Sequence, residues 1–495
     1  MTAALDLLTV AAVWTYAAAT LALAALGLHA AALAAVRLSR PRRPVPTAPP
    51  DAAWPDVVVQ LPVYDEPAAL VARALDAALA TDYPGRVEVQ LLDDSPAPAS
   101  RANAALCAER RGVRHLPRSR RDGFKAGALA WGLTHTAAPV AAVFDVDFRP
   151  APDLLATLVG PLVADPGLAF VQARWHHEPG PRLLGRAQAA VLDVHFAVEQ
   201  AGRDRAGLPL VFNGSGGAWR VAAIEDAGGW SGETLAEDSD LALRAQARGW
   251  RARLDETAVA PADLPPTVAA WRRQQARWAK GLAEVALRRL GTLWRSGLPV
   301  RARLAFTAHL ALALSLPALF VLMLLHPVVA VAAGGGLALL NVGYLALAGL
   351  VFAHVVALRA VHPGRGRAEW ARVPAALVAP VVLVVPAAVA VGQALVGRRT
   401  PFGRTPKTGA PLAERGWAEV ALAAYSALGL VAVVGAEAWG AVPFQALLAL
   451  GTAGAAVAVR RPSRSPQGHP RPQVPAVPRA EVRRPAPVPS SGAPA

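Results

Sequence analysis

The sequence predicts a mostly parallel α/β domain inserted between transmembrane α-helices. Long apolar runs that are poor in charge fill the first forty residues and much of 304–458, whereas 51–300 has an ordinary globular composition. Within the globular part, short β-rich stretches alternate with helical patterns, which is typical of a parallel sheet. With 495 residues, of which 54% are hydrophobic, the chain is too long for one ordinary domain and more apolar than most soluble proteins.

Charge and cysteine content exclude several classes of protein. The formal net charge is +15, but the arginines lie beside the apolar runs and in the C-terminal tail rather than on one stripe with interleaved aromatics. We therefore expect a lipid bilayer and no nucleic acid as partner. The lone cysteine, Cys107, excludes an intrachain disulfide and offers no cluster for structural zinc.

The first forty residues are predicted to be an N-terminal transmembrane anchor (1–40). Its apolar run, 7–36, is long enough to cross a bilayer and has no Lys or Arg before it, which favours a retained anchor over a cleaved signal peptide. Basic residues follow at once: Arg37, Arg40, Arg42 and Arg43. The positive-inside rule then places the domain 56–300 in the cytoplasm, beyond a Pro-rich linker (41–55), in a multi-pass protein of the cell inner (plasma) membrane.

A C-terminal membrane domain is expected over 301–459. Four further spans form two hairpins, 304–325 with a run inside 328–358, and 418–436 with 441–458, which makes five spans in total. Segment 374–397 is also apolar, but it carries basic residues on both flanks, so we expect a re-entrant or interfacial helix. The Pro- and Arg-rich tail, 460–495, is predicted to be disordered.

Three β-rich stretches predict buried strands in the middle domain. They are Val57–Leu61, Val87–Leu92 and Val140–Phe144, with helical patterns between them at Pro67–Ala80 and Lys125–His135. In a sheet of this type the ligand crevice lies at the carboxyl ends of the strands.

Acidic residues stand at those ends. The second strand finishes in Asp93 and Asp94, and the third runs into Asp145 and Asp147. Clustered carboxylates repel one another, and a bound divalent cation relieves the repulsion. A nucleotide-diphosphate sugar requires such a cation, because its leaving group gains negative charge as the glycosidic bond breaks.

A third acidic group, Glu237-Asp238-Ser239-Asp240, opens a helix that runs to Gly249. Helix capping explains one acidic residue in the first turn, but three are more than capping needs. The functional interpretation makes one carboxylate the general base that deprotonates an acceptor hydroxyl.

A fourth stretch, 271–281, combines arginine and tryptophan. The planar donor fork of Arg suits a diphosphate, and Trp offers a flat face on which a sugar ring stacks. The same stretch also fits a basic amphipathic helix on the membrane surface, and both interpretations can hold together.

Together these elements resemble the processive family-2 glycosyltransferases, the inverting group with a GT-A fold that includes cellulose synthase and the glucomannan synthases. The order and spacing match the D, D, D, Q-(Q/R)-x-R-W series of that family. Here the series is Asp94, Asp145 with Asp147, Asp238, and QQARW from Gln274 to Trp278. FGRTPK at 402–407, inside the loop 399–410, is similar to the gating loop of cellulose synthases, with Arg404 at the valine position.

The resemblance implies roles for individual residues and Mg²⁺ or Mn²⁺ as cofactor. Asp238 is the implied catalytic base, and the metal ligands are Asp145 and Asp147. The implied nucleotide and diphosphate contacts are Asp93, Asp94, Lys125, Asp145, Arg277 and Lys407, with the turn 213–217 next to the donor site. The implied acceptor contacts are Glu237, Gln274 and Trp278. Ala236 stands where cellulose synthases have threonine, which puts the fine positioning of the acceptor in doubt.

The expected activity is inverting transfer of a hexose from UDP-glucose or GDP-mannose to a growing β-linked polysaccharide at the membrane. Two alternatives stay open at this point. One is transfer of a single sugar to a lipid acceptor such as ceramide, diacylglycerol or polyprenyl phosphate, which needs the same donor site. The other is an inactive membrane scaffold or transporter, against which the complete acidic and arginine series argues.

Overall fold

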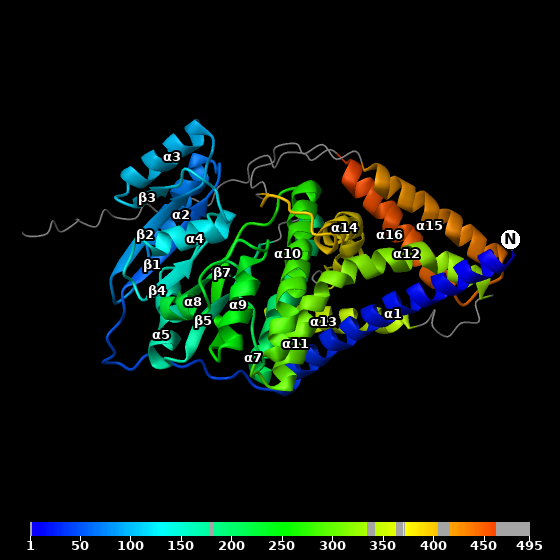
Figure 1. Cartoon of the computed structure of the whole chain (residues 1–495), viewed down its shortest axis with the longest axis horizontal. Coiled ribbons are helices and arrows are strands. Elements are labelled where there is room, and N and C mark those ends of the chain that lie inside the picture. Colours follow the sequence, from blue (N-terminus) through cyan, green and yellow to red (C-terminus); the bar gives the residue numbers. More distant parts are fainter. Residues whose placement is uncertain are drawn as a thin grey trace, which may run out of the picture.

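The computed structural model describes residues 2–178, 183–333, 342–362, 370, 372–403 and 416–461. An α/β domain lies at one end of the molecule and a group of long apolar helices at the other, with α10 (Val268–Arg295) and α11 (Val300–Ala311) between them (Figure 1). Lys407 and the rest of 404–410, as well as the tail beyond Arg461, lie outside the described residues.

The α/β domain is built on a sheet that has seven strands in the described part of the chain. The sheet order is β3-β2-β1-β4-β6-β5-β7, and only β6 runs antiparallel to its neighbours. The mostly parallel sheet that the sequence predicts is therefore confirmed. The strands are β1 (Val57–Val63), β2 (Val87–Asp93), β3 (Arg114–Pro117), β4 (Val140–Val143), β5 (Leu168–His176), β6 (Gly217–Arg220) and β7 (Arg251–Pro261).

The three predicted strands are found as β1, β2 and β4, with ends that shift by one or two residues. The two predicted helices between them are α2 (Ala68–Leu79) and α4 (Phe124–Leu133). The other four strands were not predicted.

Apolar side chains pack on both faces of the sheet, as its near-continuous aliphatic strands require. On one face, α2 and α5 (Leu154–Ala164) cover alternate residues of β1. On the other face, α4, α8 (Val221–Asp226) and α9 (Glu237–Ala247) pack against Phe170 and Trp219. The remaining helix of this domain, α3 (Pro98–Glu109), lies beside β3.

Five helical segments of the described chain are long and apolar enough to cross a membrane, as expected. They are Leu7–Ser39 in α1 (Thr2–Ser39), Val300–Ala332 in α11, η2 (Leu312–Leu314) and α12 (Ser315–Ala332), Gly343–Val361 as α13, Trp417–Gly435 as α15 and Val442–Arg460 as α16. The first hairpin was bounded wrongly, because the second span continues to Ala332 and the third begins only at Gly343. The apolar helix α12 continues through Pro327 to Ala332.

The segment expected not to cross is α14 (Arg372–Leu395). It packs along α10 and against α12, and it also meets α6 (Leu183–Val194). Ala379 and Leu383 contact Trp271 of α10. Its position relative to a bilayer stays a prediction, as do the domain boundaries.

Two short elements join the α/β domain to the apolar helices. The π-helical stretch η1 (His195–Gln200) follows α6, and α7 (Ala201–Ala206) follows η1. The close approach of α7 to α1 needs a glycine, because a Cβ at Gly202 would lie 2.8 Å from the carbonyl oxygen of Leu33.

Candidate active site

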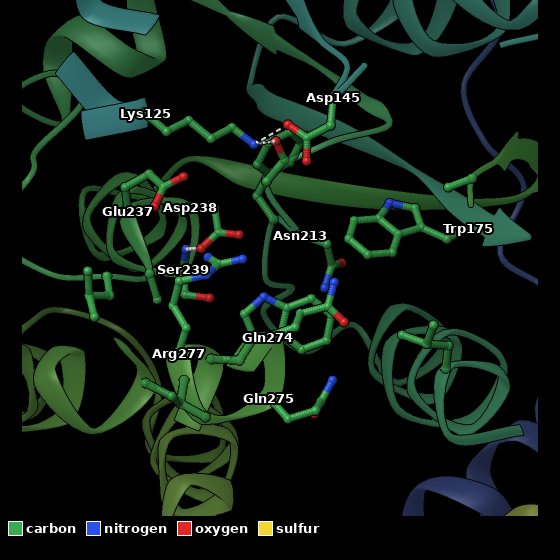
Figure 2. Close-up of a pocket in the computed structure, with 18 of the residues that line it drawn as sticks. Lys125, Asp145, Trp175, Asn213, Glu237, Asp238, Ser239, Gln274, Gln275 and Arg277 are labelled. Atoms are coloured by element: carbon green, nitrogen blue, oxygen red, sulfur yellow. Dashed lines mark hydrogen bonds and ion pairs between the residues drawn. The ribbon is translucent and has the colours of Figure 1, made fainter. Parts of the chain in front are cut away.

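A cavity of about 520 Å³ opens where the strand ends of the α/β domain meet α9, α10 and η1 (Figure 2). Most of the residues that the sequence singles out line it. They are Asp94, Lys125, Asp145, Asp147, Glu237, Asp238, Gln274, Arg277 and Trp278.

The topology explains why residues so distant in sequence meet. β1, β2 and β4 are parallel neighbours, so the residues after their carboxyl ends lie along one edge of the sheet. The helix α9 begins at Glu237, which places Glu237 and Asp238 in its first turn. The helix α10 approaches this turn closely at Gly281, where a Cβ would lie 2.7 Å from the backbone nitrogen of Ala236.

Asp93 does not line the cavity, although the resemblance implied a nucleotide contact. Its side chain is fully buried, and its carboxylate accepts hydrogen bonds from the Ser95 amide (2.8 Å) and from His115 Nε2 (2.9 Å). Burial raises the pKa of Asp93, but His115 together with the side chain and amide of Ser95 outweighs it and holds the pKa below its usual value. Asp93 thus shapes the turn that follows β2.

Asp94 does reach the cavity, and it is held by an arginine. Arg118 donates two hydrogen bonds of 2.6 Å to the two carboxylate oxygens of Asp94. This bidentate pair fixes the plane of the carboxylate. Asp94 is therefore oriented before any ligand binds.

Lys125 lies between the strand ends and α9 (Figure 2). Its Nζ donates to Asp145 Oδ1 at 2.6 Å and to the Gly214 carbonyl at 2.9 Å. Burial disfavours the ammonium charge, but Asp145 and Glu237 favour it more strongly, so the pKa of Lys125 is raised. A fixed positive charge therefore stands at the edge of the cavity.

Glu237 and Asp238 form a buried acidic pair. Burial and then the charge of Asp238 raise the pKa of Glu237 to about 7, while Lys125 opposes the rise. Burial also raises the pKa of Asp238, although Asp238 Oδ1 accepts a 2.7 Å hydrogen bond from the Ser239 amide. Gly214, with φ +79°, is required opposite the pair, because a Cβ there would lie 2.8 Å from Asp238 Oδ2. Such a pair can take up a proton near neutral pH.

Arg277 extends from α10 into the same cavity. Its guanidinium stacks on the Phe402 ring, with 4.3 Å from Cζ to the ring centroid. Its Nε is buried and has no hydrogen-bond partner among the described residues. A buried donor without a partner is costly, and an anion in the cavity would satisfy it.

The predicted metal ligands, Asp145 and Asp147, both line the cavity. Among the described residues no group of three or more His, Cys, Asp or Glu side chains is placed to hold a metal ion. Mg²⁺ is commonly held by one or two carboxylates together with phosphate oxygens of the substrate. The pair therefore fits a cation that binds with a diphosphate, and it does not form a complete protein site.

Several cavity residues were not predicted from the sequence. Trp175, His195, Glu199 and His309 also line the cavity. His195 and Glu199 are four residues apart, which in sequence resembles an ordinary pair on a helix surface.

Two family models of glycosyltransferases match the chain. Residues 58–224 match the family described as glycosyl transferase family 2, and residues 142–356 match glycosyl transferase family group 2. The chain is 38% identical over 257 residues to a protein named probable glucomannan 4-beta-mannosyltransferase 9 from Oryza sativa subsp. japonica, covering 48% of this chain and 49% of the relative. It is 36% identical over 250 residues to glucomannan 4-beta-mannosyltransferase 7 from Arabidopsis thaliana, covering 48% and 45%. The chain thus matches about half the length of these relatives.

A solved structure shares the fold. It is the mannosyltransferase PcManGT from Pyrobaculum calidifontis in complex with GDP-Man and Mn²⁺, with a TM-score of 0.51 and 23% sequence identity. The likeness covers 77% of this chain and 98% of that one. The GT-A type of fold that the resemblance implied is thereby confirmed.

Proposed function

We propose that this chain transfers a hexose from a nucleotide-diphosphate sugar to a growing β-linked glycan at a membrane. The matches of residues 58–224 to glycosyl transferase family 2 and of residues 142–356 to glycosyl transferase family group 2 support the proposal. One observation carries the proposal. A single cavity holds a cationic end, formed by Lys125 and Arg277, and an acidic pair, Glu237 and Asp238, that can accept a proton near neutral pH. Glycosyl transfer needs both, since one group leaves as an anion while another loses a proton.

GDP-mannose is the proposed donor. The relatives in rice and Arabidopsis are named as mannosyltransferases, and the solved structure of similar fold contains GDP-Man. Glucose and mannose differ at one hydroxyl, so UDP-glucose is the donor to compare directly.

Asp238 is the proposed general base. An acceptor hydroxyl next to it gives up its proton as its oxygen forms a bond to the anomeric carbon of the donor sugar. The bond from that carbon to the diphosphate breaks on the opposite face, which inverts the configuration. Arg277 then holds the departing diphosphate through its Nε, which has no partner among the described residues, and Lys125 adds a second positive charge nearby.

A divalent cation, Mg²⁺ or Mn²⁺, would be held by Asp145 and Asp147 and would supply charge neutralisation at the diphosphate. Asp94, fixed by Arg118, is the proposed contact of the nucleoside. Trp278 and Gln274 are proposed to face the acceptor sugar, since both line the cavity from α10.

The proposed site of action is the cytoplasmic face of a membrane. Five helices of the described chain are long and apolar enough to cross it, and Arg37 to Arg43 flank the end of the first one. Several spans after the catalytic domain suit passage of a polar chain, and this favours a polymer product over a single-sugar lipid.

Product analysis tests the proposal. The full chain in nanodiscs is incubated with radiolabelled GDP-mannose or UDP-glucose and with Mn²⁺ or Mg²⁺, and the labelled product is then sized. We expect label from GDP-mannose in material that a β-mannanase degrades. Label in one lipid band would show that the product is a glycolipid and not a polymer. No incorporation from any donor would overturn the proposed activity.

A further inference from the structure

A chain of hydrogen bonds runs from the active-site cavity to the membrane-side helix α11. It consists of Gln200, Asn213, His195, Glu199 and His309, and we call these five residues the relay. Three of them lie on the π-helical stretch η1. The π-helix is rare in proteins, and where it occurs it is often at a functional site. The mechanism proposed above uses none of them.

The direction of every hydrogen bond in the first half of the relay follows from one backbone carbonyl. Gln200 Nε2 lies 2.7 Å from the carbonyl oxygen of Val211, which can only accept, so this atom must be the amide nitrogen. The same Nε2 lies 2.8 Å from Asn213 and therefore faces its oxygen, Oδ1. The amide nitrogen of Asn213 must then face His195, where Nδ2 lies 2.7 Å from Nε2.

The second half of the relay is determined in the same way. Since His195 Nε2 accepts from Asn213, its Nδ1 carries the hydrogen and donates to Glu199 Oε2 at 2.9 Å. His309 Nδ1 lies 2.7 Å from the other oxygen of Glu199, and Arg203 Nη2 lies 3.4 Å from it. Burial raises the pKa of the Glu199 carboxyl, but His309 and His195 lower it well below its usual value. Glu199 is thus a carboxylate that accepts from both imidazoles.

The membrane-side end of the relay is anchored. His309 lies on α11, at the start of the apolar segment Val300–Ala332. Arg203 is fully buried and donates to the carbonyl of Ala305 on the same helix, at 3.1 Å. A shift of α11 would therefore move the two partners of Glu199, His309 and Arg203.

The cavity end of the relay presents a donor. One Nδ2–H of Asn213 is used by His195, and the other has no partner in the described part of the chain. Figure 2 shows Asn213 in the cavity, with Asp238 on one side and Trp175 on the other. The amide is held from behind, because Gln200 fixes its oxygen and Gln172 accepts from its backbone nitrogen at 3.0 Å.

From this geometry we propose that Glu199, His195 and His309 are positioning residues that hold the Asn213 amide so that its free N–H donates to a hydroxyl oxygen of the acceptor sugar. The inference rests on the proposed function and adds the acceptor side to it. Asn213 precedes Gly214, which abuts the base Asp238, so its side chain is near the hydroxyl that reacts. The relay joins Asn213 to α11. Lys125 and Asp145, the residues proposed to lie next to the diphosphate, are bonded to each other on the sheet side of the cavity. The resemblance implied that the turn 213–217 lies next to the donor site. For Asn213 we instead propose a contact with the acceptor.

Paired variants test the relay by sugar binding, without any need for turnover. His195→Leu removes the acceptor opposite Asn213, whereas His195→Gln offers an amide oxygen there. Glu199→Leu removes the carboxylate that accepts from both imidazoles, so the His195 ring loses the partner that orients it. Glu88→Gln is the matched control, because Glu88 accepts hydrogen bonds from Thr136 and Gln90 outside the cavity.

The affinities of full-length protein in nanodiscs for β-1,4-mannotetraose and cellotetraose are measured by isothermal titration calorimetry. We expect His195→Leu and Glu199→Leu to weaken binding about tenfold, as loss of one oriented hydrogen bond would, and His195→Gln and Glu88→Gln to stay near wild type. The affinity for GDP with Mn²⁺ should not change in any variant. If Glu199→Leu fails to fold, as judged by its thermal unfolding, the two His195 variants decide.

Two results would overturn the relay proposal. One is equal oligosaccharide affinity in His195→Leu and His195→Gln, and the other is a wild-type protein that binds neither oligosaccharide. Failure of the proposed function looks different. In that case the protein binds the oligosaccharide in a relay-dependent way but transfers no sugar from any nucleotide donor.

Discussion

Replacement of Asp238 by asparagine should abolish transfer while the donor site stays intact. The asparagine side chain would keep an oxygen that accepts from the Ser239 amide, as the carboxylate does at 2.7 Å, so the first turn of α9 has no reason to unfold. The amide cannot accept the proton of the acceptor hydroxyl, and general-base catalysis contributes about 100- to 10,000-fold to such reactions. Lys125 keeps its 2.6 Å contact with Asp145, so the cationic end of the cavity persists. We therefore expect kcat to fall by about 100-fold or more.

The assay separates chemistry from binding. Transfer of radiolabelled mannose from GDP-mannose to β-1,4-mannotetraose gives kcat, and calorimetry with GDP and Mn²⁺ gives the donor-site affinity. Asp226→Asn is the matched control, since Asp226 bonds to Arg248 and Trp250 on the surface, away from the cavity. A kcat for Asp238→Asn within tenfold of wild type, with normal GDP affinity, would refute the assignment of the base.

Three further predictions concern pH, metal and stability. Because burial raises the pKa of Glu237 to about 7, the acidic pair takes up a proton as pH falls through about 7, and kcat should fall with it. Glu237→Gln leaves Asp238 without an acidic neighbour and should move this fall to lower pH, and an unmoved pH profile would contradict the coupling. Asp147→Asn should raise the Mn²⁺ concentration needed for half-maximal GDP binding, whereas an unchanged requirement would remove Asp147 from the metal site. Glu419→Ala leaves the buried Arg272 without its carboxylate partner at 2.5 Å and should cost about 3–5 kcal/mol, seen as a lower unfolding temperature in nanodiscs; an unchanged temperature would contradict it.

Periodicity and composition predicted the sheet only where the strands are continuous aliphatic runs. β1, β2 and β4 are such runs and were placed to within two residues. β6 is a four-residue strand, Gly217–Arg220, that begins with glycine and follows a glycine-rich turn, so its local signal favours a loop. Its pairing with β4 and β5 is a tertiary effect that the local sequence does not encode.

The candidate site was more predictable on its proposed donor side than on its proposed acceptor side. Carboxylates that follow parallel strands must meet at one edge, so Asp94, Asp145 and Asp147 could be brought together from sequence. The orientation of each side chain could not be predicted from the sequence. Asp93, which is adjacent to Asp94, turns into the protein toward His115. The relay was missed for a related reason, since Glu199 and His309 are partners only after α11 packs against η1.

The charge of the cavity links the proposed base to the proposed cation. Among the described residues that line it, Asp and Glu outnumber Lys and Arg eight to three. Arg118 lies outside the cavity and offsets the charge of Asp94. Lys125 and Arg277 lower the pKa of Glu237, but they only partly oppose the effects of burial and of Asp238. Burial and then the charge of Asp238 raise the pKa of Glu237 to about 7, and the excess of carboxylates that line the cavity would repel a nucleoside diphosphate that binds alone. We therefore expect a donor diphosphate to bind more tightly when a divalent cation binds with it. The acidic pair that is proposed to supply the base thus adds to the negative charge that a divalent cation is expected to offset when the donor binds.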